Sequence, residues 1–235
     1  MKNVVLASTS TLRGESYLEY LFPVIEPLFQ KSKEVIFIPY ARPGGITHDE
    51  YTLKVKEVFD QLRLKVKGIH EFKKPVEAMK DAEAIFIGGG NTFLLLDKLY
   101  RNNLINQIKE NVSIGIPYLG ISAGTNVAGL SIQTTNDMPI IYPPAFQSLG
   151  LVPFNINPHY LDTVPSSTHG GETRETRIKE FHTINTQPVI GLREGSWLEY
   201  FGDQILLKGR LPARIFKMEK EPYEVESNTN LSDLN

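Results

Sequence analysis

Apolar runs of four residues alternate with longer segments of helical periodicity along most of the chain. The runs lie at 4–7, 35–38, 84–87, 118–121 and 189–192. Short apolar runs are typical of buried strands, and strands that alternate with helices form parallel sheets. The pattern therefore predicts an α/β fold of three layers, helix-sheet-helix, with a mostly parallel central sheet.

Helical spacing occupies the segments between these runs. Apolar residues three and four positions apart predict helices at 18–28, 51–62, 92–112 and 171–184. Pro23 and Pro27 should kink or divide the first of them. A further strand-like run covers 151–154.

The pattern changes after Trp197. Short apolar stretches are separated there by Gly202-Asp203 and Lys208-Gly209, which are turn sequences. They predict a closing antiparallel hairpin rather than a second domain, so residues 1–235 are expected to form one domain. The residues from Glu224 onward are polar and are expected to be frayed.

Composition narrows the functional class. The 235 residues are 41% hydrophobic and 22% charged, with a formal net charge of −2, which gives no electrostatic bias toward nucleic acid or anionic membranes. Cysteine is absent, so disulfides, thiolate metal sites and a cysteine nucleophile are excluded. The apolar start becomes polar at Ser8, too early for a secretory signal, and no run approaches membrane-spanning length. We expect a cytoplasmic protein.

Ser122 is the candidate nucleophile. It stands in Gly120-Ile121-Ser122-Ala123-Gly124, between an apolar run and a small-residue segment. Glycines flank a nucleophile of this kind because the sharp strand-to-helix turn is strained and crowded. The same spacing also occurs in ordinary tight turns, so the interpretation depends on finding a base.

His159 is the candidate base. It follows Asn155-Ile156-Asn157-Pro158 at the end of a strand-like segment, where α/β proteins usually form their sites. The other histidines, His48, His70, His169 and His182, are interpreted as structural or surface residues. Among these four, His169 is the one expected to line the mouth of a site.

The carboxylate that would orient His159 has two candidates. Asp137 lies between the serine and the histidine in the chain, in the turn-like Thr135-Asn136-Asp137-Met138-Pro139. Glu194 lies in a turn after the run at 189–192. The residues alone leave both open.

A glycine-rich turn offers an oxyanion hole. Gly88-Gly89-Gly90-Asn91 follows the run at 84–87 and precedes a leucine-rich helix, and it lacks the spacing of a phosphate or dinucleotide loop. The N–H of Gly90 could act together with that of Ala123, the residue after the serine. Asn91 as an ordinary helix cap is a compatible interpretation.

Arg174 is the candidate substrate ligand. It lies four residues before Ile178, on the apolar face of the helix predicted at 171–184. An arginine in that place either extends to solvent or holds a carboxylate.

Six motifs in this order resemble those of the dipeptidase E family, also called peptidase E or α-aspartyl dipeptidase. They are GGGNTF at 88–93, GISAG at 120–124, TTNDMPI at 134–140, NPH at 157–159, GETRE at 171–175 and EGSW at 194–197. The resemblance implies a cytoplasmic serine exopeptidase that cleaves Asp-Xaa dipeptides without metal or cofactor, on a fold related to class I glutamine amidotransferases.

The resemblance also assigns roles by matching positions. It implies Ser122 as nucleophile, His159 as base, Asp137 as third member, Gly90 and Ala123 as oxyanion hole, Glu194 as alternative acid and Arg174 as the ligand of the aspartyl carboxylate.

Other functions fit the same residues. One is a cyanophycinase-like β-aspartyl peptidase or an esterase, and another is a catalytically silent protein that binds an acidic metabolite. A metallopeptidase is not indicated, because no H-E-x-x-H cluster is present. The expected partner is a small peptide, with no nucleic acid and no membrane, and the sequence specifies no oligomeric state.

Overall fold

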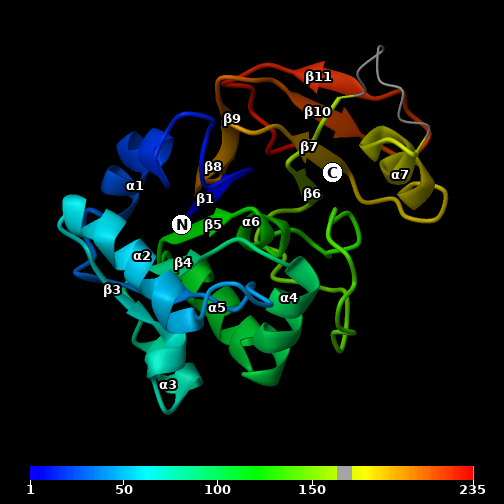
Figure 1. Cartoon of the computed structure of the whole chain (residues 1–235). Coiled ribbons are helices and arrows are strands. Elements are labelled where there is room, and N and C mark those ends of the chain that lie inside the picture. Colours follow the sequence, from blue (N-terminus) through cyan, green and yellow to red (C-terminus); the bar gives the residue numbers. More distant parts are fainter. Residues whose placement is uncertain (163–170, 235) are drawn as a thin grey trace.

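The computed structural model describes residues 1–162 and 171–234. Its larger sheet has seven strands in the order β3-β2-β4-β5-β1-β8-β9 (Figure 1). The first five strands run parallel, and β8 and β9 form the antiparallel hairpin predicted after Trp197. The strands are β1 Lys2–Ala7, β2 Glu34–Ile38, β3 Lys65–Gly68, β4 Ile85–Ile87, β5 Tyr118–Ile121, β8 Ser196–Gly202 and β9 Gln204–Gly209.

Helices cover both faces of this sheet. Alternate strand residues point to opposite faces, so Val5 and Phe37 pack in the core that contains α1 and α2, whereas Val4 and Ile36 pack in the core that contains α3, α4 and α5. The predicted three-layer architecture is therefore confirmed. The helices are α1 Phe22–Phe29, α2 His48–Gln61, α3 Pro75–Lys80, α4 Thr92–Arg101, α5 Leu104–Ser113, α6 Ala123–Asn126 and α7 Arg174–Phe181, with short 3₁₀ turns at Glu19–Leu21 and Ile69–Glu71.

A second sheet of four strands, in the order β11-β10-β7-β6, was not predicted. It consists of β6 Asn155–Pro158, β7 Val189–Leu192, β10 Ala213–Phe216 and β11 Tyr223–Val225. One face of this sheet packs in the main core through Ile190, Leu192 and Ile215. Ile178 of α7 packs in a small cluster with Val189. The strand predicted at 189–192 thus exists, but it belongs to this second sheet.

Three local predictions were wrong. The helix expected at 92–112 divides into α4 and α5, because Asn103 adopts a left-handed conformation that asparagine tolerates. The run at 151–154 has three buried residues, Leu151, Val152 and Phe154, but forms no strand, and pairing begins only at Asn155. The segment after Glu224 is not frayed: β11 pairs with β10, the Leu231 N–H bonds to the carbonyl of Ile205 at 2.7 Å, and Leu231 is buried.

Within the described residues, no helix is both long and apolar enough to span a membrane.

Candidate active site

Ser122 occupies a strained turn between β5 and α6. Its backbone angles are φ 53° and ψ −108°, outside the regions that residues with side chains prefer. A Cβ at Gly120 would come within 2.6 Å of the Gly124 carbonyl oxygen, and a Cβ at Gly124 would overlap the Ile87 carbonyl oxygen. Both glycines are therefore required sterically, as the motif around Ser122 predicts.

His159 lies directly after β6 and reaches the serine. Its Nε2 is 2.8 Å from Ser122 Oγ. The backbone of His159 has a positive φ of 53°, and its N–H donates to Ser8 Oγ at 2.8 Å. Ser8 in turn donates to the Leu192 carbonyl at 2.8 Å. This hydroxyl therefore links the ends of β6 and β7 next to His159.

Glu194 completes a chain of three side chains. It follows β7, and its Oε1 lies 2.6 Å from His159 Nδ1. The carboxylate is about half exposed, with 49% of the side chain accessible. This arrangement of hydroxyl, imidazole and carboxylate is the geometry in which a histidine accepts a proton from serine while the carboxylate fixes its tautomer.

Asp137 has different contacts from those expected. Its Oδ2 accepts from the Thr92 N–H at 2.7 Å and from Thr135 Oγ1 at 3.3 Å, and no hydrogen bond joins it to His159 in the described part of the chain. The expectation that Asp137 orients His159 does not match these contacts. A carboxylate is favoured at the first turn of α4, because free N–H groups and the helix dipole meet it there.

The glycine turn after β4 lies beside the serine. A Cβ at Gly89 would be 3.1 Å from Ser122 Cβ. The Gly89 N–H donates to the buried hydroxyl of Tyr51 at 3.1 Å, whereas the N–H groups of Gly90 and Ala123 have no acceptor among residues 1–162 and 171–234. Two free donors near a nucleophile are suited to an oxyanion.

The turn also caps a helix. Asn91 accepts from the Leu94 N–H at 3.0 Å, so the capping interpretation is confirmed.

A cavity of about 190 Å³ opens beside the serine. This volume is below the range of about 300–1,000 Å³ usual for ligand pockets, so it suits a small molecule. Its walls are Thr92, Ser122, Ala123, Thr135, Asn136, Asp137, Pro158, His159 and Arg174.

Arg174 brings a positive charge to this cavity from the first turn of α7. Burial, with the charge of Arg177, lowers the pKa of its guanidinium, although arginine stays protonated at neutral pH. It forms no ion pair with residues 1–162 or 171–234. The cavity therefore holds a partly buried cation suited to an anionic group of a ligand.

Known proteins that are similar to this chain are peptidases. The model of Peptidase family S51 matches residues 4–208. The chain belongs to this family. It is 46% identical over 232 residues to Peptidase E of Streptomyces coelicolor, covering 99% of this chain and 94% of that protein.

Two further relatives extend the comparison of this S51 peptidase. It is 45% identical to the "Probable alpha-aspartyl dipeptidase" of Drosophila melanogaster, covering 99% of this chain and 97% of the fly protein. The crystal structure of a peptidase from an acI-B1 Actinobacterium matches with a TM-score of 0.72 at 19% identity, over 98% and 96% of the two chains. That second likeness shows the common fold.

Three other histidines of the S51 peptidase, His48, His70 and His182, have no contact with the triad. His70 pairs with Asp49 at 2.8 Å and its ring contacts His48, and His182 bonds to the Asn185 carbonyl after α7. His169 lies outside the described residues. Within those residues, no group of three or more histidine, aspartate or glutamate side chains is placed to hold a metal ion.

Sequence reasoning missed the supporting residues. Ser8 and Tyr51 are both buried polar groups that hold the backbone of the site. A signal existed for Ser8, since it is the first polar residue after a buried strand. Tyr51 sits in the apolar stripe of α2, where nothing distinguishes it from a core residue.

Proposed function

We propose that this S51 peptidase hydrolyses dipeptides with an N-terminal aspartate through a Ser122 acyl-enzyme. The observation that carries the proposal is the hydrogen-bonded series Ser122, His159 and Glu194 at the edge of a small cavity, whose arginine forms no ion pair within the described residues. The name of the fly relative, alpha-aspartyl dipeptidase, supports the same substrate. The proposal includes the cytoplasmic location and the single domain predicted from the sequence.

Acylation uses the contacts already described. His159 Nε2 takes the proton from Ser122, whose Oγ attacks the peptide carbonyl, and Glu194 stabilises the imidazolium. The N–H groups of Gly90 and Ala123 hold the oxyanion. His159 then gives its proton to the departing amine, which leaves as the second amino acid.

Deacylation reverses the roles. His159 takes a proton from water, the resulting hydroxide attacks the ester of Ser122, and the proton returns to the serine oxygen as aspartate departs. The atoms balance with one water per peptide bond.

Two charges in the cavity select the substrate. Arg174 pairs with the aspartyl side-chain carboxylate. Asp137 has its Oδ1 free of hydrogen bonds within the described residues and lines the same cavity, so it accepts from the substrate's ammonium group. A site with these partly buried charges rejects Leu-Leu, because Arg174 would be left without a ligand carboxylate.

The test is the release of free amino acids from Asp-Leu, Leu-Leu and β-Asp-Leu. We expect turnover of Asp-Leu alone, lost in Ser122→Ala and retained in the surface control Ser113→Ala, with a fluorophosphonate adding its mass at Ser122. Faster hydrolysis of β-Asp-Leu or of a simple ester would favour the rival hydrolases. Binding of Asp-Leu without hydrolysis or labelling would favour the binding protein.

A further inference from the structure

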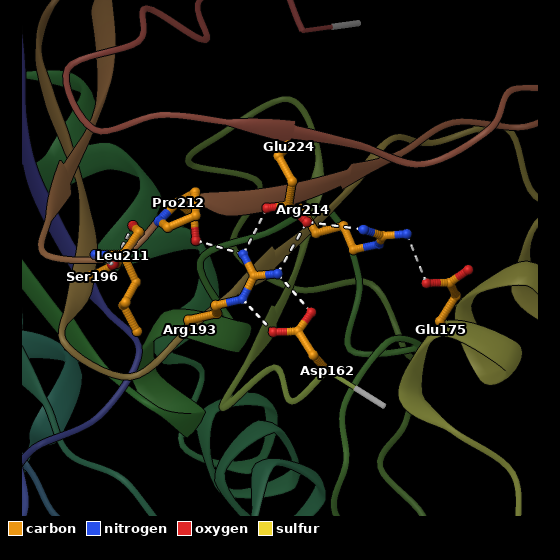
Figure 2. Close-up of polar contacts among 8 residues, drawn as sticks. All are labelled: Asp162, Glu175, Arg193, Ser196, Leu211, Pro212, Arg214 and Glu224. Carbon is orange, nitrogen blue, oxygen red and sulfur yellow. Dashed lines mark hydrogen bonds and ion pairs between the residues drawn. The ribbon is translucent and has the colours of Figure 1, made fainter. Parts of the chain in front are cut away.

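A cluster of ion pairs covers the second sheet beside the site, centred on Arg193 (Figure 2). The Arg193 Nε and Nη2 form a fork on Asp162, at 2.8 and 2.6 Å. Nη1 donates to the Pro212 carbonyl at 2.8 Å, and Nη1 and Nη2 reach the Glu224 carboxylate at 2.7 and 3.0 Å. All five N–H donors of the guanidinium are thus used, and its side chain is only 12% exposed.

Arg214 of β10 extends the cluster to α7. Its Nη1 donates to Glu224 Oε1 at 2.9 Å, and its Nη2 lies 3.0 Å from Glu175 Oε2 (Figure 2). Glu224 is therefore shared by the two arginines. The hydrogen bond from Arg193 also lowers the pKa of the Asp162 carboxyl, so that carboxylate stays ionised across the neutral range.

Three members of the cluster lie within three positions of a site residue in the chain. Arg193 immediately precedes Glu194, Asp162 is three residues after His159, and Glu175 immediately follows Arg174. The cluster therefore joins the three segments that carry the base, its carboxylate and the substrate ligand.

The cluster is not what folds the second sheet. Ile190, Leu192 and Ile215 are fully buried in the main core, which fixes β7 and β10 by apolar packing. The ion pairs lie on partly exposed side chains, where each adds little to the free energy of unfolding. A planar guanidinium instead fixes the relative orientation of the two carboxylates that it binds, and the ammonium group of a lysine cannot do so.

We propose that Arg193 and Arg214 are positioning residues with separate effects. Arg193 holds the turn that presents Glu194 to His159, so it acts on the rate of the chemical step. Arg214 holds Glu175 and with it the first turn of α7, so it acts on Arg174 and on the choice of an acidic first residue. The second effect rests on the proposed function; the first requires only that Ser122 be activated by His159.

The experiment measures fluorophosphonate labelling of Ser122 and steady-state hydrolysis of Asp-Leu and Asn-Leu. The variants are Arg193→Lys, Arg214→Gln and the control Lys179→Gln, which removes the other partner of Glu175 at 2.9 Å. Since a misplacement of about 1 Å costs about 10²-fold in rate, a smaller shift should cost about tenfold.

We expect Arg193→Lys to slow labelling and lower kcat about tenfold with an unchanged KM. We expect Arg214→Gln to leave labelling and kcat unchanged, to raise the KM for Asp-Leu about tenfold and to reduce the preference for Asp-Leu over Asn-Leu by a similar factor. In the Glu175→Gln background, Arg214→Gln should have no further effect on KM. Lys179→Gln should match the wild type.

Labelling and kinetics separate the possible failures. Equal labelling rates in the wild type and Arg193→Lys would overturn the inference. So would the same pattern of kcat and KM changes in Arg193→Lys and in Arg214→Gln. A wild type that labels at Ser122 but does not hydrolyse Asp-Leu would refute the proposed substrate and the effect assigned to Arg214, while the labelling rates still decide the effect of Arg193.

Discussion

The two sides of the site are built by different forces. On the nucleophile side, β4, β5 and α6 meet so closely that Gly120 and Gly124 have no room for a side chain. On the base side, His159 and Glu194 extend from the second sheet and are held by hydrogen bonds and ion pairs between segments far apart in the chain. The first side depends on steric fit and the second on charge and direction.

This difference predicts how each side responds to change. Steric contacts between backbones leave no way to relax, so one methyl group should be decisive on the nucleophile side. Polar contacts on partly exposed side chains can re-form through water, so losses of the contacts that support His159 and Glu194 should be graded.

On the nucleophile side, the largest effect is expected from Gly124→Ala. Its new Cβ would overlap the carbonyl oxygen of Ile87, so β4 and α6 must separate and both the serine and the Ala123 N–H would shift. Because misplacement and loss of an oxyanion donor each cost about 10²-fold, kcat should fall by about 10³-fold or more. Gly44→Ala is the matched control, since a Cβ there meets open space; equal activities of the two variants would contradict the steric account.

Arg174→Met, which removes the positive charge from the cavity, should have a smaller effect on activity. The aspartyl carboxylate would lose its cation, and hydrogen bonds to charged groups are worth about 1.5–3 kcal/mol, so kcat/KM for Asp-Leu should fall about 10²-fold. Hydrolysis of Asn-Leu should change much less. A uniform loss on both dipeptides would instead indicate that the substitution damages the site.

Tyr51→Phe should have a smaller effect on the nucleophile side. The Gly89 N–H would lose its acceptor in a buried place, which costs about 1–3 kcal/mol of stability. We expect kcat to fall about tenfold through a shift of the neighbouring Gly90, with KM unchanged. Tyr100→Phe, which removes an exposed bond to the Gln147 carbonyl, should leave thermal unfolding and kcat as they are.

The smallest effect is a pH dependence of stability from Asp162. Arg193 lowers the pKa of this carboxyl in the folded protein below its ordinary value of 3.8. The ion pair therefore stabilises the fold above about pH 4, and this contribution is lost as the pH falls through the lower, folded-state value. The difference in unfolding free energy between the wild type and Asp162→Asn, about 1 kcal/mol or less for an exposed pair, should shrink as the pH falls below about 4. A difference that grows on acidification would have the wrong sign.

The same contrast explains what could be predicted from the sequence. The strands before residue 122 and the nucleophile turn follow from local patterns, because apolar runs and glycine spacing record steric demands directly. The second sheet was missed, since its strands are short and pair with strands far away in the sequence, as β7 pairs with β10.

Local sequence patterns could not show which carboxylate contacts His159, for a related reason. Asp137 and Glu194 both stand in turns, and the distance of each from His159 is set by long-range packing. The resemblance pointed to Asp137, whereas the contact is made by Glu194. Arg174 was found because its helix places it on the apolar face, beside the stripe that packs inward.

The central claim is that Glu194 orients His159 while Asp137 binds the substrate. The most direct test compares kcat and KM for Asp-Leu in Glu194→Gln and Asp137→Asn. The account predicts that Glu194→Gln lowers kcat, by up to about 10⁴-fold as for other triad acids, with little change in KM, whereas Asp137→Asn mainly raises KM. A near-normal kcat in Glu194→Gln together with loss of turnover in Asp137→Asn would contradict it.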